Sequence, residues 1–369
     1  MKILFDHLCF SEKYGGVSKY FTKLIHNLSD EVQYEIAVKY TNNEYIKELS
    51  LAKIKRIFEN VSFRGKMSII SAINKPYSIR KIKQGDYGIY HQTHYDPYAY
   101  RYLPRNKIGI TTIYDMNFYV IPEAYGNNRF NFLMRWQKTS AKKANKIIAI
   151  SNNTKNDLIN TWNIPEKKIE VIYLGVEEIN IDKDNNKRLY SNPYILFVGQ
   201  RLFYKNFHNY LKAFKILTQT NPDLILVCTG VPFSKKEMKI FYQIGLSDKI
   251  VHISASESKM INLYYNAELF VYPSLHEGFG MPLLEAMNCY CPIICSETSC
   301  FPEIAKDAAL YFDPYVIESM VETTQKVLDG TEIRKRLIQN GIQRKKDFSW
   351  KKCAEEHIRL YNDLYAEYY

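Results

Sequence analysis

Short apolar runs alternate with stretches of helical periodicity along almost the whole chain. Strands of this kind, joined by helices, build parallel sheets with helices packed on their faces. The alternation therefore predicts an α/β protein. The expected strands are 3–5, 34–38, 87–91, 109–114, 146–150, 168–173, 194–199, 224–227, 250–253, 269–272, 293–296 and 309–312. The expected helices are 17–28, 130–144, 154–161, 207–218 and 235–244, with a helical finish from 316 onward.

A polar segment divides this pattern into two series. At 369 residues the chain is long for one hydrophobic core and sufficient for two. Residues 179–192 are rich in Asn and Asp, which favours a linker. We therefore expect an N-terminal Rossmann-like, doubly wound domain at 1–178 and a C-terminal one at 193–347. Ligands of such domains bind beyond the carboxyl ends of the strands, so the two domains imply a cleft between them.

Positive charge is concentrated in the first half of the chain. The formal net charge is +11, and residues 53–146 alone carry 18 Lys and Arg against 5 Asp and Glu. Such a basic region suits an anionic membrane surface or a phosphate-bearing partner. A nucleic-acid partner is not favoured, because no zinc finger, RNA-recognition signature or helix-turn-helix pattern is present.

The expected helix at 130–144 is the candidate for contact with a membrane surface. Its basic and apolar residues interleave as in an interfacial helix, although the same apolar residues would also suit a core. The basic residues are Arg135, Lys138, Lys142, Lys143 and Lys146, and the apolar ones are Phe130, Phe132, Leu133, Met134 and Trp136.

The chain has no feature of a membrane-spanning or exported protein. No apolar run reaches the ~18 residues that a membrane span needs. The first ten residues are too short and mixed for a signal peptide and instead predict a buried strand. We therefore expect a cytoplasmic location, with peripheral attachment to the inner face of the membrane as a further possibility.

Seven cysteines are present, four of them close together at Cys289, Cys291, Cys295 and Cys300. Their spacing differs from that of zinc sites, and no histidine lies near them in the sequence. The apolar residues around Cys295 favour buried, reduced thiols.

The stretch HEGFGMPLLEAM, residues 276–287, holds the strongest functional signal. Glu277 and Glu285 flank a glycine-rich turn, and Pro282 suits the first turn of a helix. We expect the N–H groups of the turn and of the helix start to face outward, which suits a phosphate group. One carboxylate is then placed to hold a sugar and the other a ribose, with a diphosphate between them.

This stretch resembles the E-x7-E signature of the retaining glycosyltransferases of family 4, or group 1, which have the GT-B fold. Residues 272–274, 292–294, 301–304 and 308–314 also resemble that family. The resemblance implies two Rossmann-like domains facing a cleft. It also implies that the final helix, 348–369, packs back on the N-terminal domain.

The resemblance further implies transfer of a hexose from a UDP- or GDP-sugar to a hydroxyl of a glycan or lipid-linked acceptor. The anomeric configuration would be kept, and surface polysaccharide (O-antigen or capsule) assembly with mannose is the first candidate. The alternatives are an enzyme that makes a soluble small-molecule glycoside and a catalytically silent module that binds nucleotides.

Cations after the strand at 194–199 are expected to bind the diphosphate. Gly199 ends that strand, and Arg201 and Lys205 follow it four positions apart. A guanidinium grips two oxygens, and a lysine adds a compact charge. We therefore expect neither a cofactor nor a metal, since Arg201 and Lys205 would replace the cation. An Asp-x-Asp pair, Asp182 and Asp184, lies in the expected linker.

The remaining candidates are assigned through the resemblance. Glu277, Arg201, Lys205 and Asp115 are expected to be catalytic. The donor-binding set is Glu285, Gly278, Phe279, Gly280, Met281, Gly199, Gly15 and Gly16. The residues expected to contact the acceptor or the sugar are His91, His94, Tyr114 and Ser151. Tyr114 stands where many family members have a histidine, so a histidine-assisted step at this position is in doubt.

Overall fold

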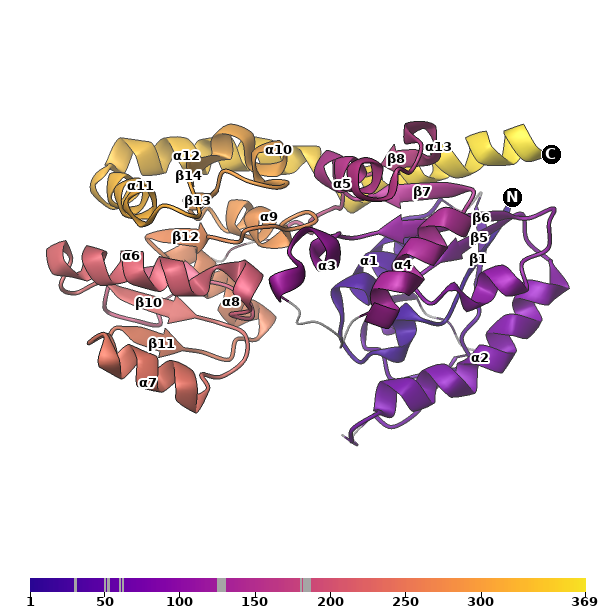
Figure 1. The fold of residues 1–369 in the computed structure, drawn as a ribbon, viewed down its shortest axis with the longest axis horizontal. Helices are drawn as coiled ribbons and strands as arrows, with labels where there is room; N and C mark the ends of the chain where they lie inside the picture. The colour runs from indigo at the N-terminus through magenta and orange to yellow at the C-terminus, as the bar shows by residue number, and fades with distance from the viewer. Residues whose placement is uncertain are drawn as a thin grey trace. The chain divides into compact units, whose positions relative to one another are not determined.

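The computed structural model describes residues 1–29, 32–49, 51, 54–59, 61, 63–124, 131–179, 181 and 187–369 (Figure 1). It contains two compact units. Unit 1 comprises Met1–Tyr119, Tyr125–Gly175 and Ser349–Tyr369, and unit 2 comprises Val120–Ala124 and Val176–Phe348. Phe130, Asp182 and Asp184, which the sequence singled out, lie outside the described residues.

Unit 1 is built on a six-stranded parallel sheet in the order β2-β1-β5-β6-β7-β8. Its strands are β1 (Lys2–Phe5), β2 (Gln33–Ile36), β5 (Ile89–Gln92), β6 (Ile108–Ile113), β7 (Lys146–Ala149) and β8 (Ile169–Val171). A separate parallel pair consists of β3 (Tyr40–Thr41) and β4 (Lys55–Arg56). The strand order reverses between β1 and β5, which is where doubly wound sheets bind ligands.

The helices of unit 1 come from both ends of its sequence. They are α1 (Gly16–His26), α2 (Lys66–Gln84), α3 (Asn117–Val120), α4 (Asn131–Lys143), α5 (Asn152–Trp162) and α13 (Trp350–Tyr368). The yellow helix α13 lies with the indigo and magenta elements of unit 1 (Figure 1). At Gly175 an added Cβ would come within 2.2 Å of the backbone nitrogen of Trp350. Position 175 therefore has to be glycine for the two backbone segments to lie this close.

Buried histidines and tyrosines join α13 to the rest of unit 1. The ring of His357 hydrogen-bonds Tyr20 of α1 at 2.7 Å, and the Tyr361 hydroxyl reaches the ring of His91 at 2.7 Å. All four side chains are 3% exposed or less. The last helix therefore completes the core of unit 1 through specific polar contacts as well as apolar packing.

Unit 2 is a second six-stranded parallel sheet, in the order β11-β10-β9-β12-β13-β14. Its strands are β9 (Tyr194–Phe197), β10 (Ile225–Cys228), β11 (Ile250–His252), β12 (Leu269–Tyr272), β13 (Ile293–Ser296) and β14 (Ala309–Phe312). Its helices are α6 (Phe207–Thr220), α7 (Lys235–Gln243), α8 (Glu257–Asn266), α9 (Met281–Asn288), α10 (Phe301–Ala305), α11 (Ile317–Asp329) and α12 (Thr331–Arg344). This is the classic dinucleotide-fold order, with its switch point between β9 and β12.

The expected α/β class with two doubly wound sheets is confirmed. The central apolar runs become strands because they are buried on both faces of the sheet, as all four residues of β9, β10, β12 and β13 are. All seven cysteines are free and buried, as the apolar context of Cys295 indicated. Helix α2 is the longest element that the apolar pattern did not predict.

Candidate active site

Two loops at the switch point of unit 2 carry the strongest candidate residues. Strands β9 and β12 are neighbours, and both point their carboxyl ends to the same edge of the sheet. The loop after β9 leads through Gly199 to Lys205, and the loop after β12 leads to Glu277. The sheet therefore brings together two segments that are more than 70 residues apart in the sequence.

Glycines let the backbone of neighbouring loops meet at this edge. Gly199 has φ +110° and Gly230, which follows β10, has φ +92°. A Cβ on Gly230 would lie 2.6 Å from the carbonyl oxygen of Gly199, far inside contact distance. Both positions therefore require glycine, and the loops after β9 and β10 pack backbone against backbone.

Lys205 and Glu277 form a close ion pair. The Nζ of Lys205 lies 2.6 Å from Oε1 of Glu277, and both side chains are 13% exposed. Lys205 also donates to the hydroxyl of Tyr272 at 3.3 Å. Burial, and next the charge of Glu277, raises the pKa of Tyr272 well above its usual value, so the phenol stays neutral. The structure thus places the expected cation beside the expected catalytic carboxylate.

The backbone of Glu277 is held by Ser299 in the loop after β13. The Glu277 N–H donates to Oγ of Ser299 at 3.0 Å, and that hydroxyl donates to the Glu277 carbonyl at 2.7 Å. Ser299 itself has φ +57°, an uncommon conformation for a residue with a side chain. This reciprocal pair fixes the position of Glu277, and nothing in the local sequence indicated it.

The glycine-rich turn then leads into α9. Gly280 has φ +83° and is the N-cap of that helix, with Pro282 in the first turn as expected. Phe279 is 3% exposed, and its ring packs edge-on against Phe348, so its side chain belongs to the interior of unit 2. Glu285 lies about one turn into α9 and accepts a hydrogen bond from the Tyr264 hydroxyl at 3.0 Å. Helix α9 therefore begins four residues after Glu277, with Pro282 in its first turn.

Arg201 lines a pocket of unit 2 and has several partners within that unit. Its side chain is 2% exposed and forms a 2.6 Å ion pair with Glu237 of α7. The remaining guanidinium N–H groups donate to the carbonyls of Thr229, Val231 and Pro232. These partners hold Arg201 against α7 and the loop after β10, whereas Lys205 is paired with Glu277.

Two candidates in unit 1 are structural residues. His91 is fully buried, and its ring nitrogens hydrogen-bond Tyr361 at 2.7 Å and Thr112 at 2.9 Å. Ser151 is also fully buried and caps α5 by accepting from the Thr154 N–H at 3.0 Å. The expectation that these two side chains contact acceptor or sugar is corrected accordingly, because both are committed to the interior.

The other candidates of unit 1 lie around the segment after β6. One carboxylate oxygen of Asp115 accepts from the Asn117 N–H at 3.0 Å, a turn that leads into α3. The Tyr114 hydroxyl is buried and has no hydrogen-bond partner among the described residues. The ring centroids of His94 and Tyr95 lie 5.1 Å apart. Burial lowers the pKa of His94, which favours the neutral imidazole.

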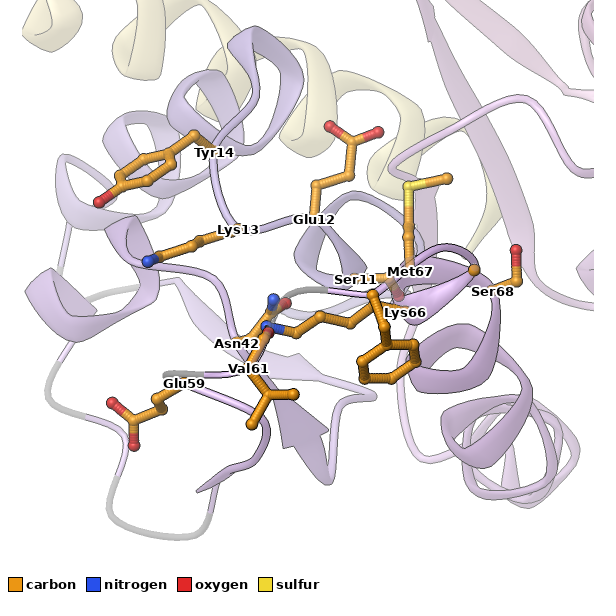
Figure 2. Close-up of a pocket in the computed structure, with 12 residues that line it drawn as sticks. Ser11, Glu12, Lys13, Tyr14, Asn42, Glu59, Val61, Lys66, Met67 and Ser68 are labelled. Carbon is orange, nitrogen blue, oxygen red and sulfur yellow. The ribbon is translucent and has the colours of Figure 1, made fainter.

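A pocket of about 740 Å³ opens in unit 1 beside the start of α1. The residues that line it are Ser11–Tyr14, Asn42, Glu59, Val61, Phe63 and Gly65–Ser68 (Figure 2). Asn42 is 3% exposed, yet its Oδ1 has no partner among the described residues. Gly16, the first residue of α1, faces open space, since a Cβ there would meet nothing within 4 Å. A buried, unpaired acceptor in a pocket wall is suited to a polar ligand.

Sequence reasoning missed Asp6 and His7, which directly follow β1 at the switch point of unit 1. Both are fully buried. Burial raises the pKa of Asp6 to about 6 even though Thr93 and Tyr90 donate to it, and burial lowers the pKa of His7 to about 3. Their position at a strand end was the available signal. The burial that gives them these pKa values arises only in the folded chain.

Two doubly wound units, one with a Lys–Glu pair and a glycine-rich helix start at its switch point, define a glycosyltransferase of the GT-B fold. Two family models match the chain nearly end to end. The model for "Glycosyltransferase Family 4" matches residues 14–178, and that for "Glycosyl transferases group 1" matches residues 178–344. The chain therefore belongs to the family 4, or group 1, glycosyltransferases, as the sequence motifs indicated.

Characterised relatives and solved structures are consistent with this membership. The chain is 27% identical to the O-antigen chain mannosyltransferase B of Escherichia coli, over 73% of this chain and 75% of that protein. It is 30% identical to the O-antigen chain mannosyltransferase RfbU of Salmonella typhimurium, over 58% of each chain. A sucrose-phosphate synthase from Thermosynechococcus elongatus has the same fold, with a TM-score of 0.75 and 17% identity over 100% of both chains. Anabaena HepE in complex with UDP superimposes with a TM-score of 0.73 at 16% identity, over 98% of this chain and 100% of that one.

No described helix has both the length and the hydropathy of a membrane span. Among the same residues, no group of three or more His, Cys, Asp and Glu side chains is placed to hold a metal ion.

Proposed function

We propose that this glycosyltransferase moves a hexose, with mannose as the first candidate, from a nucleotide diphosphate sugar to a hydroxyl of a glycan or lipid-linked acceptor. The proposal includes retention of the anomeric configuration and no requirement for a metal ion. The names of the relatives, O-antigen chain mannosyltransferases, support mannose and surface polysaccharide assembly. The single observation that carries the proposal is the Lys205–Glu277 pair beside the start of α9.

The donor would bind across the switch point of unit 2. The amides at the start of α9 and the ammonium of Lys205 stabilise the charge that develops on the departing diphosphate. Glu277 then binds sugar hydroxyls and favours positive charge at the anomeric carbon. Glu285, which Tyr264 orients, accepts from the ribose hydroxyls. Because a lysine supplies the positive charge beside the phosphates, the reaction needs no metal ion there.

The acceptor would enter the pocket of unit 1 shown in Figure 2. Asn42 offers it an unpaired carbonyl oxygen, and the wall also contains the ammonium of Lys13. Such a mixture of polar groups suits a sugar hydroxyl or a phosphate-linked sugar. An Asn42→Ala variant should therefore raise KM for the acceptor without changing KM for the donor.

The test is transfer from GDP-mannose and UDP-glucose to a lipid-linked glycan, with NMR of the product to assign the anomeric configuration. Lys205→Met and Glu277→Gln should each lower kcat by about 10²-fold or more, because each removes charge aligned with the transition state. Lys212→Met, at an exposed lysine on α6, is the matched control and should leave kcat unchanged. Full turnover in both site variants would refute the proposal.

A catalytically silent, nucleotide-binding module is the second candidate, and it is favoured by the loss of the usual histidine at Tyr114. It predicts tight binding of GDP or UDP by calorimetry and no transfer with any donor.

Retained activity in the presence of EDTA would support the metal-independent reaction, whereas loss of activity with EDTA and its recovery with a divalent cation would contradict it.

A further inference from the structure

Lys205 and Glu277 neutralise each other within unit 2. The ammonium of Lys205 lies 2.6 Å from Oε1 of Glu277, and both side chains are 13% exposed. The same ammonium donates to the Tyr272 hydroxyl and lies 5.3 and 5.0 Å from the ring centroids of Tyr204 and Tyr272. A lysine ammonium is a single, compact charge. Its close anion is therefore a carboxylate of the protein itself, where the proposed function puts a diphosphate.

The backbone on both sides of this pair is held by hydrogen bonds. The Leu275 N–H donates to the Tyr204 carbonyl at 2.7 Å, which joins the loop after β12 to the loop after β9. The hydroxyl of Ser299 holds the backbone of Glu277 from the other side. A change of partner at Lys205 therefore needs rotation of side chains and no movement of a loop.

Tyr272 gives Glu277 a second partner. Burial is the main cause of the raised pKa of this phenol, and its hydrogen bond to Glu277 is another. The side chain is 2% exposed at the end of β12. Because the phenol is neutral, it attracts a phosphate less than an ammonium does. Glu277 therefore keeps a hydrogen-bond donor when Lys205 turns to another anion, and a carboxylate without any partner is avoided.

A diphosphate at Lys205 competes with Glu277 for one positive charge. The diphosphate and the carboxylate repel each other, and this repulsion is strong where little water screens it. A nucleotide diphosphate sugar carries more than one negative charge, so it is the stronger partner for the ammonium.

We propose that the diphosphate of the donor replaces Glu277 as the partner of Lys205, and that this exchange releases the Glu277 carboxylate for the sugar. The inference rests on the proposed function and adds an order of events to it. A free hexose brings no anion and leaves Glu277 paired with Lys205. The carboxylate becomes available only to a sugar that arrives with a phosphate group, which selects the donor.

Calorimetric titration of the full chain with GDP and with UDP tests the exchange, because neither nucleotide brings a sugar for Glu277 to bind. Glu277→Gln keeps the size of the side chain and removes its charge. It should tighten nucleotide binding about tenfold, since no ion pair has to be separated. The matched control is Glu297→Gln, which removes an exposed carboxylate one residue after β13, at the same edge of the sheet. This control should change binding by less than about twofold.

A double-mutant cycle separates the exchange from simple repulsion between anions. Lys205→Met alone should weaken nucleotide binding. In the Lys205→Met chain no pair remains to be separated, so adding Glu277→Gln should tighten binding by no more than about twofold. A gain in that background equal to or larger than the gain in the unaltered chain would overturn the proposal, because the diphosphate would then join the pair without separating it. If circular dichroism shows that Lys205→Met does not fold, Lys205→Gln takes its place in the cycle.

These titrations do not depend on sugar transfer. If transfer is observed and Glu277→Gln binds neither nucleotide more tightly than the unaltered chain, the exchange is wrong and the proposed function stands. Tighter binding by Glu277→Gln, together with no transfer from any donor by the unaltered chain, supports the exchange and refutes the proposed function. An unaltered chain that binds neither GDP nor UDP refutes both.

Discussion

Acid should destabilise unit 1 through His357. The ring is fully buried, and its two nitrogens lie 2.7 Å from the Tyr20 hydroxyl and 2.7 Å from the Cys353 carbonyl. Burial lowers the pKa of His357 to about 4, against about 6.5 in an unfolded chain. Between these pH values the unfolded chain binds a proton that the folded chain does not. Stability is therefore intact above about pH 6.5 and falls as the pH drops toward 4.

The pKa difference sets the size of the effect. At pH 5 it corresponds to about 2 kcal/mol of lost unfolding free energy, and the loss approaches its limit of about 3 kcal/mol near pH 4. His357→Gln keeps a side chain capable of hydrogen bonding but cannot take up the proton. The variant should be less stable at neutral pH. Its unfolding free energy should fall by about 2 kcal/mol less between pH 7 and pH 5 than that of the unaltered protein.

Urea unfolding at a series of pH values, monitored by tryptophan fluorescence, tests this pH dependence of stability. The three tryptophans, Trp136, Trp162 and Trp350, all belong to unit 1, so the signal reports that unit alone. Asp6 and His7 also have shifted pKa values, in opposite directions, but they are present in both proteins and largely cancel in the difference. Profiles with the same slope in the unaltered protein and the His357→Gln variant would refute the reasoning.

Three further substitutions have defined outcomes in unit 2. Arg201→Leu should lower the unfolding free energy by about 2–4 kcal/mol, because the carboxylate of Glu237 loses its cation. The same change should alter KM for the donor less than about threefold. Urea unfolding monitored by circular dichroism measures the first effect, and steady-state kinetics measures the second. Gly230→Ala should cost about 1–3 kcal/mol in the same unfolding assay, since φ +92° and the 2.6 Å approach to Gly199 exclude a side chain. Ser299→Ala should remove two hydrogen bonds to Glu277, costing about 1–2 kcal/mol of stability and lowering kcat more than donor affinity. Unchanged kcat in that variant would show that Glu277 keeps its position without Ser299.

The sheets could be predicted from the sequence because their central strands are buried on both faces and appear in the sequence as short, continuous apolar runs. Helix α2 could not, because its inner face contains Asn74 and Ser78 and its outer face contains Ile69 and Ile73. Hydrogen-bond partners from distant segments make this arrangement stable. Such partners are tertiary, so no periodicity within the helix reveals them.

The candidate site was predicted in part for a similar reason. Residues at strand ends and in glycine turns, such as Lys205 and Glu277, come together through sheet topology, which the motif spacing reflects. Arg201 has the same local appearance as Lys205. Its direction is decided by Glu237, which is 36 positions away. The contact that orients Arg201 therefore lies outside the motif.

The order in which the units are completed follows from the way unit 1 is divided along the chain. The hydrogen bond between Tyr20 and His357 joins residues 337 positions apart, and most of unit 2 lies between them. During synthesis, unit 2 can finish folding while the core of unit 1 still lacks α13. Unit 1 then gains its last buried contacts only after the whole of unit 2 has left the ribosome. Premature termination before the buried residues of α13 would release a chain with a finished unit 2 and an open, aggregation-prone unit 1.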